Sequence, residues 1–331
     1  MSYCWYYVYI LMKMCEDTMY EIIFNPGSKS NNSNLIWETV EKYLLKNEIT
    51  YHLNKTKGPH HAKELAHKIT SDGNEHTIIV IGGDGTLNEV VNGLYDPDKV
   101  TLGLIPSGSG NDFAKATGLS TIPEEAITTI LNCTEEQKSL VNYGEMHAAG
   151  RCHRFLISCG CGFDSDVCVD VQTSKLKPIL NKIGLGKLTY TIVALAKLIK
   201  MSVFSAHFNI DDNNEYDMDK MFFLTAMNTI YEGGGYMFCP DASPCDDKLD
   251  LLTVHSMTRK RIIPLLPKAK KGKHVGAKGI DIQPISSVDM SFSKPVNVHT
   301  DGEVIGSFDK VRIECAKKHI KFCLPEIKKY D

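Results

Sequence analysis

Residues 82–85 read Gly-Gly-Asp-Gly, so three glycines surround the single carboxylate of Asp84. An apolar, mostly β-branched run at residues 77–81 precedes this stretch, and Thr86 follows it. Glycine has no Cβ atom, so its backbone N–H group can come close to a ligand. At the start of a helix, such N–H groups and the positive end of the helix dipole attract phosphate. The stretch therefore predicts a nucleotide-binding loop, because an ordinary strand-to-helix turn would need only one glycine.

Neither of the two common nucleotide-binding fingerprints fits this loop. A dinucleotide fold requires G-x-G-x-x-G, and Asn88 stands where the third glycine belongs after Gly83 and Gly85. A P-loop requires G-x-x-x-x-G-K-[ST], and the sequence contains no such run. The loop therefore belongs to a less common class of nucleotide site.

A second glycine-rich stretch follows the next apolar run. Residues 106–114 read Pro-Ser-Gly-Ser-Gly-Asn-Asp-Phe-Ala, between a strand expected at residues 101–105 and a helix expected at residues 111–117. In an open parallel sheet, ligands bind beyond the carboxyl ends of the strands. We therefore expect the two glycine-rich loops to face one crevice.

Two carboxylates lie close together near the end of the chain, at Asp301 and Glu303 with Gly302 between them. A carboxylate can orient or deprotonate an attacking hydroxyl group. Asp-Gly is also a favoured hairpin turn, and apolar residues flank it on both sides. The two interpretations are compatible, because a tight turn can direct a carboxylate into a cleft.

The elements that must position these residues alternate in the first third of the chain. Short apolar runs predict strands, and apolar residues at helical spacing separate them. This alternation predicts parallel strands joined by crossover helices. The expected strands cover residues 22–24, 49–53, 77–81 and 101–105, and the expected helices cover residues 35–46, 60–69, 87–94 and 111–117.

The pattern changes after about residue 134, where strand signals dominate and predict an antiparallel sheet or sandwich. We expect an N-terminal extension at residues 1–18, an α/β domain at 19–135 and a β-sandwich domain at 136–316, with residues 317–331 packing back on the α/β domain. One helix is expected at residues 188–201. The expected strands are residues 154–161, 206–210, 221–227, 249–255, 288–292 and 311–315.

Composition excludes several classes of protein. The net charge of −3 over 331 residues provides no global positive field for nucleic acid. The eleven cysteines form no C-x-x-C pair, which favours free thiols in a reducing cytosol. The apolar stretch at residues 4–12 is shorter than the roughly 20 residues that span a bilayer. It is interpreted as a membrane-surface anchor, a packed segment or residues upstream of a start at Met19.

The motifs occur in an order that resembles the diacylglycerol kinase catalytic domain family, in its bacterial soluble lipid kinase form. The resemblance covers nearly everything from residue 20 onward. Besides the two glycine-rich loops, it rests on residues 24–28, Thr56 with His61-Ala62, Gly162-Phe163-Asp164, Gly233-Gly234-Gly235 with Pro240-Asp241-Ala242, Gly272-Lys273-His274, and Asp301-Gly302-Glu303.

The resemblance implies a phosphofructokinase-like α/β domain followed by an antiparallel β-sandwich, with the active site between them. It implies transfer of the γ-phosphoryl group of ATP to a lipid hydroxyl, with diacylglycerol as the favoured acceptor and phosphatidate as the product. Alternatives are another lipid acceptor (a sphingoid base, phosphatidylglycerol or another lipid alcohol), an NAD kinase, and a nucleotide-binding regulatory protein on a degenerate kinase fold. Residues 107–113 and the Asp301–Glu303 pair argue against NAD kinase.

Carried over residue by residue, the resemblance assigns roles to individual positions. Asp301 is the first choice for general base and Glu303 the second. Asp84 would lie near the phosphates and their Mg²⁺, and Asp246, with the carbonyls of Ser243 and Lys248, would hold a structural Mg²⁺. The ATP contacts would be Asn25, Pro26, Thr56, Gly82, Gly83, Asp84, Gly85, Thr86, Leu87, Asn88, Glu89, Ser109, Asn111 and Asp112.

Two positions depart from the family pattern. The family usually has glycine where Asp247 stands, which puts the geometry of the Asp246 loop in question. It commonly has aspartate where Asn142 stands. The alternative for the Asp246 loop is a solvated acidic turn.

A local basic stretch stands out against the negative whole chain. Near an anionic bilayer each such charge contributes about 1 kcal/mol, and Leu265 and Leu266 could insert. This predicts a cytoplasmic protein that associates peripherally with the inner face of the membrane; the alternative is a solvated lysine face. A homodimer is left open. The basic residues are Lys260, Arg261, Lys268, Lys270, Lys271, Lys273 and Lys278.

Overall fold

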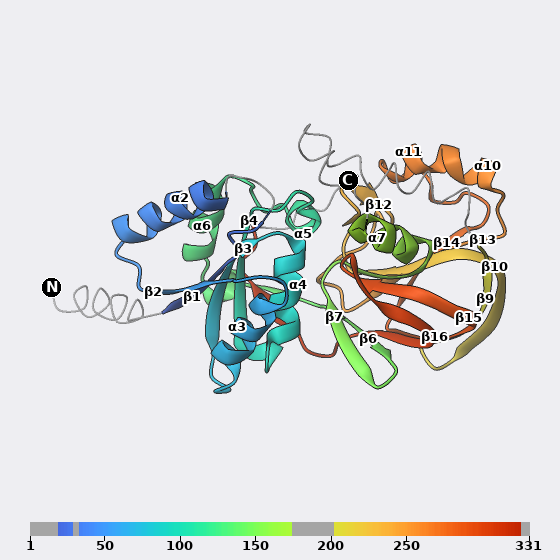
Figure 1. Ribbon diagram of the computed structural model, residues 1–331, viewed down its shortest axis with the longest axis horizontal. Coiled ribbons are helices and arrows are strands. Elements are labelled where there is room, and N and C mark those ends of the chain that lie inside the picture. Colours follow the sequence, from blue (N-terminus) through green and yellow to red (C-terminus); the bar gives the residue numbers. More distant parts are fainter. Residues whose placement is uncertain (1–18, 29–32, 174–201, 326–331) are drawn as a thin grey trace.

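The computed structural model describes residues 19–28, 33–173 and 202–325. They form an α/β body built on a six-stranded sheet and a β-rich body built on a nine-stranded sheet, which lie side by side (Figure 1). This arrangement confirms the fold class expected from the sequence. The extension at residues 1–18 and the helix expected at residues 188–201 lie outside the described residues.

The six-stranded sheet has the order β2-β1-β3-β4-β17-β5. Its first four strands are parallel, as the alternation of strands and helices predicts. β17 comes from the far end of the chain and lies parallel to β4, and β5 pairs antiparallel with β17. The strands are β1 (Tyr20–Phe24), β2 (Tyr51–Lys55), β3 (His76–Gly82), β4 (Val100–Pro106), β5 (Ser139–Val141) and β17 (Ile320–Phe322).

Helices cover both faces of this sheet, because its central strands are apolar on both faces. Ile78 and Val80 of β3 pack with α3 and α4, whereas Ile79 and Ile81 pack with α2 and α6. The two-sided burial explains why residues 77–81 show no alternation of polar and apolar residues. The helices are α2 (Ser33–Lys46), α3 (His61–Thr70), α4 (Asp84–Gly93), α5 (Asp112–Ala116) and α6 (Pro123–Leu131), with 3₁₀ turns η1 (Pro97–Lys99) and η2 (Glu135–Gln137).

The nine-stranded sheet is antiparallel throughout and encloses a second apolar core. Its strands follow the order β14-β13-β10-β8-β15-β16-β6-β7, and β9 pairs with β10 and β15. The strands are β6 (Gly144–Ala148), β7 (Arg151–Phe155), β8 (Ser158–Gly162), β9 (Phe204–Ile210), β10 (Asn214–Met227), β13 (Leu249–His255), β14 (Ile280–Ile285), β15 (Ser287–Thr300) and β16 (Glu303–Cys315).

Short elements complete the β-rich body. β11 (Tyr231–Glu232) and β12 (Tyr236–Met237) form a two-stranded ribbon. The helices are α7 (Phe163–Thr173), α10 (Arg259–Ile262), the 3₁₀ turn η4 (Ile263–Leu265) and α11 (Leu266–Ala269). Among the described residues, no helix combines the length and the apolar character needed to cross a membrane.

One expected strand is wrong. Residues 154–161 were expected to form a single strand, but they divide into the end of β7 and most of β8. Leu156 and Ile157 separate the two strands, and their backbone N–H groups bind the Asp301 carboxylate instead of a neighbouring strand. Both residues are apolar and buried, so nothing in the local pattern distinguishes them from strand residues.

Candidate active site

The two glycine-rich loops touch each other through their backbones. A Cβ atom built on Gly108 would lie 2.6 Å from the Cα of Gly83, and one built on Gly83 would lie 2.9 Å from the Cα of Gly108. Real Cβ atoms do not come this close to backbone, so glycine is required at both positions. The loops follow β3 and β4, and the Ser107 N–H donates to Gly82 O at 2.8 Å. The structure thus brings together the two loops that the sequence places at one edge of the sheet.

Open space lies in front of Gly85, in the first turn of α4. A Cβ built on Gly85 would meet no atom within 4 Å. Asp84, which precedes it, begins α4. The N–H groups of a first helical turn have no partner within the helix, and they carry the positive end of its dipole. The first turn of α4 can therefore receive a phosphate.

Hydrogen bonds join the loop after β1 to both glycine-rich loops. The Asn25 Nδ2 group donates to Thr86 Oγ1 at 2.8 Å, and the hydroxyls of Ser28 and Ser107 lie 2.7 Å apart. Thr56 is buried beside this loop, and its N–H donates to Phe24 O. Pro26 and Ser109 are exposed at the surface of the same region.

Asp84 is held by the start of α5. Its Oδ2 accepts the Asp112 N–H at 3.0 Å, and its Oδ1 accepts the Phe113 N–H at 3.3 Å. Burial raises the pKa of Asp84 to about 6, and the charge of Asp112 adds to this effect. Each Asp84 oxygen accepts one of these bonds, so lone pairs remain for a cation.

Asp112 connects the α/β body to the three glycines at residues 233–235. Its Oδ2 accepts the Gly234 N–H at 2.7 Å, and its Oδ1 pairs with Lys115 Nζ at 3.0 Å. Asn111 precedes α5 with a φ of 52°, and its Oδ1 accepts the Gly108 N–H. Asn111 therefore holds the backbone of a loop in the α/β body, and Asp112 holds backbone of the β-rich body.

Three of the expected nucleotide contacts face away from the open space. Leu87 is buried in the apolar core. Asn88 Nδ2 donates to Asp301 Oδ2 at 2.8 Å, across 213 residues of sequence. Glu89 accepts the N–H groups of His60 and Ala62 at the start of α3. In this structure these three side chains support α4 and its neighbours from behind the loop.

Asp301 is partly buried, and its carboxylate accepts hydrogen bonds from four donors. Oδ1 accepts the N–H groups of Ile157 (2.8 Å) and Ser158 (3.0 Å). Oδ2 accepts the Leu156 N–H (3.0 Å) and the Asn88 amide. A carboxylate offers about four lone-pair sites, so this one has none left for a substrate hydroxyl. Burial raises the pKa of Asp301, and the backbone N–H groups act in the opposite direction.

Glu303 has different surroundings from Asp301. Its side chain is 43% exposed, and Oε1 lies 3.8 Å from Nδ1 of the exposed His60. Asp301 and Gly302 form the two-residue turn between β15 and β16, with φ values of 49° and 81°. The Asp-Gly hairpin turn expected from the sequence is thus present, and it leaves one carboxylate saturated with hydrogen bonds and the other accessible.

Sequence reasoning did not identify a buried cluster beneath this turn. The Gly302 N–H donates to His299 Nδ1 at 3.1 Å, so Nε2 carries the proton that faces Asp164 at 2.7 Å. Glu232 Oε1 lies 3.3 Å from the same Nε2. Burial raises the pKa of Glu232 to about 8, and the charge of Asp164 adds to this effect. Only the position of His299, two residues before Asp301, could have drawn attention to it.

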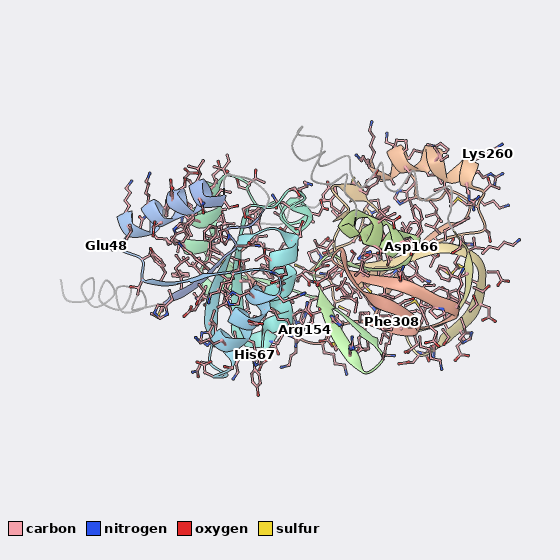
Figure 2. The ribbon with its side chains drawn as sticks, in the orientation of Figure 1. Glu48, His67, Arg154, Asp166, Lys260 and Phe308 are labelled. Atoms are coloured by element: carbon pink, nitrogen blue, oxygen red, sulfur yellow. The ribbon has the colours of Figure 1, made fainter. Side chains whose placement is uncertain are left out.

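Sequence reasoning also did not identify Arg154, which joins β7 to α4. Its Nη1 donates to the carbonyls of Val91 (3.1 Å) and Leu94 (2.9 Å) at the end of α4. Its own carbonyl accepts from the amides of Asn88 and Asn92. Figure 2 shows Arg154 between the two bodies. The second half of helix α4 is therefore fixed to the β-rich body.

The loop expected to hold a structural Mg²⁺ has the backbone that the family pattern requires. Asp247 takes a φ of 62°, a conformation that glycine adopts easily, and His319 pairs with its carboxylate. Asp246 Oδ1 accepts the Lys248 N–H, which leaves Oδ2 without a hydrogen bond to a described residue. Asn142 lies against the loop, donates to Lys248 O at 3.2 Å, and has a buried Oδ1 without a partner. Carboxylate and amide oxygens are ligand types that a hard divalent cation accepts.

Comparisons with family models and known proteins cover most of the chain. Residues 20–143 match the diacylglycerol kinase catalytic domain. Residues 158–322 match the YegS C-terminal NAD kinase beta sandwich-like domain. Two solved structures from Bacillus anthracis str. Sterne share the fold. One, titled a diacylglycerol kinase, has a TM-score of 0.66 at 20% identity and covers 94% of this chain and 98% of its own. The other has a TM-score of 0.74 at 24% identity, with 93% and 98% covered.

Two curated relatives are similar to this chain in amino-acid sequence. A probable lipid kinase YegS-like from Xanthomonas axonopodis pv. citri is 30% identical, over 76% of this chain and 79% of the relative. A diacylglycerol kinase from Bacillus subtilis is 29% identical, over 76% and 78%. The two family models together cover residues from both bodies. The chain therefore belongs to the diacylglycerol kinase family in its YegS-like form, and it is a lipid kinase.

Proposed function

We propose that this lipid kinase transfers the γ-phosphoryl group of ATP to the hydroxyl of diacylglycerol, which yields phosphatidate and ADP. The contact between Asn88 and Asp301 carries the proposal. Helix α4 offers its first turn to the phosphates, and through Asn88 it also holds the turn that carries Glu303. One rigid element can thus align ATP, the phosphoryl donor, with the lipid hydroxyl that accepts the phosphoryl group. The names of the relatives, lipid kinase and diacylglycerol kinase, support the acceptor class.

In this proposal ATP lies over the two glycine-rich loops. The N–H groups at the start of α4 hold phosphate oxygens, and Asn25, Thr56 and Ser109 line the nucleotide. Leu87, Asn88 and Glu89 act indirectly, because their side chains support α4. A Mg²⁺ ion would fit beside Asp84, where it would neutralise charge on the phosphates.

We propose Glu303 as the general base and Asp301 as the residue that positions it. Glu303 is accessible and can accept the proton of the lipid hydroxyl while the hydroxyl oxygen attacks the γ-phosphorus. Asp301 would have to break a hydrogen bond to accept the same proton. This reverses the order of preference that we took from the sequence.

A structural Mg²⁺ is proposed at Asp246, with the carbonyls of Ser243 and Lys248. The unpartnered Oδ1 of Asn142 beside this loop supports the site. Addition of Mg²⁺ to metal-free protein should raise the melting temperature of the wild type and leave that of Asp246→Asn unchanged. An equal increase in both proteins would count against the site.

The proposal places the protein at the inner face of an anionic membrane in the cytoplasm. Residues 256–280 contain eight Lys and Arg and no Asp or Glu. Ile263 and Val275 are 49% and 51% exposed among them. α10 and α11 form one outer edge of the β-rich body, where Lys260 also lies (Figures 1 and 2).

The test is a kinase assay with labelled ATP, Mg²⁺ and a panel of acceptors in mixed micelles. The panel contains diacylglycerol, a sphingoid base, phosphatidylglycerol and a long-chain lipid alcohol, with NAD assayed separately in solution. We expect label in phosphatidate above all other products. Preferential labelling of another lipid would identify that lipid, and not diacylglycerol, as the acceptor. Labelling of NAD alone would exclude the proposal.

A further inference from the structure

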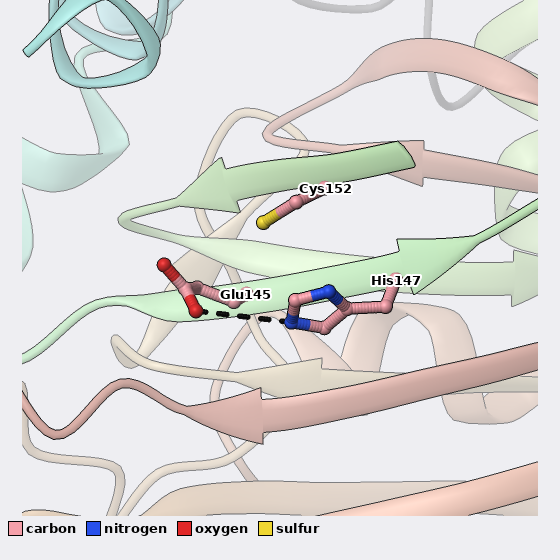
Figure 3. A group of neighbouring side chains, drawn as sticks. All are labelled: Glu145, His147 and Cys152. Carbon is pink, nitrogen blue, oxygen red and sulfur yellow. Dashed lines mark ion pairs between the residues drawn. The ribbon is translucent and has the colours of Figure 1, made fainter. Parts of the chain in front are cut away.

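A group of metal-ligating side chains lies on the outer part of the nine-stranded sheet, away from the turn that carries Glu303. Glu145 and His147 lie on β6, and Cys152 lies on β7 directly opposite His147. Glu314 of β16 is the direct neighbour of Glu145 on the other side. Figure 3 shows the side chains of Glu145, His147 and Cys152 on one side of the β6–β7 hairpin.

Neighbouring arginines engage only one oxygen of each carboxylate. Arg312 donates to Glu314 Oε2 through Nε (3.1 Å) and Nη2 (3.0 Å). Arg154 Nε lies 3.6 Å from Glu145 Oε1. The remaining oxygens, Glu314 Oε1 and Glu145 Oε2, lie 3.2 and 3.7 Å from His147 Nε2. An ordinary network of ion pairs therefore leaves two carboxylate oxygens directed at one imidazole nitrogen.

That nitrogen is buried and makes no hydrogen bond. One ligand atom each from Glu145, His147 and Cys152 lie within 4.8 Å of one another. Zinc bonds of about 2.0–2.3 Å in a tetrahedron place ligand atoms roughly 3.3–3.8 Å apart. The group can therefore close around such an ion through small side-chain movements.

We propose that Glu145, His147 and Cys152 bind a zinc-type divalent ion, with the carboxylate of Glu314 beside His147. An imidazole, a thiolate and carboxylates form a donor set that zinc accepts, whereas Mg²⁺ and Ca²⁺ take oxygen ligands. The site shares no residue with the Mg²⁺ sites proposed at Asp84 and Asp246. Because Arg154 of the same hairpin fixes α4, a bound ion would stabilise the strand pair on which the phosphate-binding helix rests.

The test uses Co²⁺ as a spectroscopic substitute for zinc on the metal-free full chain. Thiolate ligation gives a sulfur-to-cobalt charge-transfer absorption, and we expect it at one Co²⁺ per chain, displaced by Zn²⁺. Cys152→Ser should abolish the absorption, and His147→Gln and Glu145→Gln should weaken Zn²⁺ binding by more than about tenfold. The matched control is His207→Gln, which removes a histidine paired with Asp217 on the same sheet and should bind like the wild type.

Circular dichroism and the melting temperature of each metal-free variant establish that it is folded before metal is added. Cys152 is exposed, so its replacement by serine should leave the fold unchanged. The inference is overturned if the wild type shows no charge-transfer absorption. It is also overturned if Cys152→Ser keeps the absorption, or if His147→Gln and His207→Gln bind Zn²⁺ equally well.

Discussion

Asp301 and Glu303 are two residues apart, yet their carboxylates have opposite surroundings. Asp301 satisfies three backbone N–H groups and one amide, and Glu303 faces solvent beside His60. The proposed roles, positioning for Asp301 and general base for Glu303, can therefore be tested separately by substituting each residue.

The first prediction compares two amide substitutions. Glu303→Gln should lower kcat by roughly 10²–10⁴ with an unchanged melting temperature. Asp301→Asn should lose about 2–4 kcal/mol of unfolding free energy, because its NH₂ group would face N–H donors. The measurements are steady-state kinetics and thermal unfolding. Equal kcat for wild type and Glu303→Gln would remove Glu303 from the role of base.

The second prediction concerns the pH dependence of stability. The pKa of Glu232 is raised from 4.5 to about 8, by burial first and then by Asp164. The native state therefore holds a proton that the unfolded state releases between these pH values, so stability falls as pH rises from about 4.5 to 8. Glu232→Gln should reduce this decline, and the variant should be more stable than the wild type above pH 8, by an amount on the order of a few kcal/mol.

Denaturant titrations at pH 5, 7 and 9 measure this effect. The control is Glu124→Gln, which removes a carboxylate near the start of α6, in the α/β body. The expectation fails if wild type and Glu232→Gln lose stability in parallel between pH 5 and pH 9.

At the scale of elements, the first turn of α4 should tolerate a methyl group in the free protein but not in the complex with ATP. Gly85→Ala meets no atom within 4 Å, and it should stabilise the helix by about 0.4–1 kcal/mol. The new methyl group would occupy the space through which phosphate approaches the N–H groups. We therefore expect KM for ATP to rise at least roughly tenfold.

The control for this substitution is Gly58→Ala, where an added Cβ also meets no atom within 4 Å. Gly58→Ala should leave KM for ATP unchanged and should change the melting temperature only slightly. If the two variants have the same KM, the space in front of Gly85 is not the phosphate site.

The elements also show how far sequence reasoning reaches. β3 could be predicted because Ile78 to Ile81 are buried on both faces, and the glycine-rich loops could be predicted because close approach requires glycine. The division of residues 154–161 could not, because Leu156 and Ile157 turn toward a carboxylate 145 and 144 residues away. The same tertiary contact decides that the carboxylate of Asp301, and not that of Glu303, is saturated with hydrogen bonds.

At the scale of the whole molecule, the last described strand completes the first sheet. β17 lies between β4 and β5, with Ile320 and Phe322 fully buried and the Phe322 ring 5.1 Å from that of Phe113. A chain that ends after residue 143 should lack a cooperative melting transition. Without β17, one of the two strands beside β4 is missing, together with the apolar surface of Ile320 and Phe322. Circular dichroism on heating measures the transition.

The matched control joins residues 316–325 to residue 143 through a flexible linker. Replacing the missing strand in this way should restore cooperative melting. A cooperative transition in the shorter chain alone would show that the α/β body does not need β17.

The proposed membrane docking would also be a property of the whole molecule, because it would depend on one basic edge of a chain with net charge −3. Lys268→Glu with Lys271→Glu should weaken binding to phosphatidylglycerol-containing vesicles at least about tenfold. Added salt should weaken wild-type binding. The control is Lys42→Glu with Lys46→Glu on α2. Electrostatic docking would be excluded if cosedimentation with the vesicles changed neither with added salt nor with the Lys268→Glu and Lys271→Glu substitutions.

The position of β17 has a consequence for synthesis on the ribosome. β4 ends at Pro106, but its neighbour in the sheet begins at Ile320, which is 214 residues later (320 − 106). At about 5–20 residues per second, the nascent chain waits roughly 10–40 s before this strand exists. During that time the edge of β4 is exposed to other chains and to chaperones. A chain that stops before Ile320 would leave this edge of β4 without the strand that covers it.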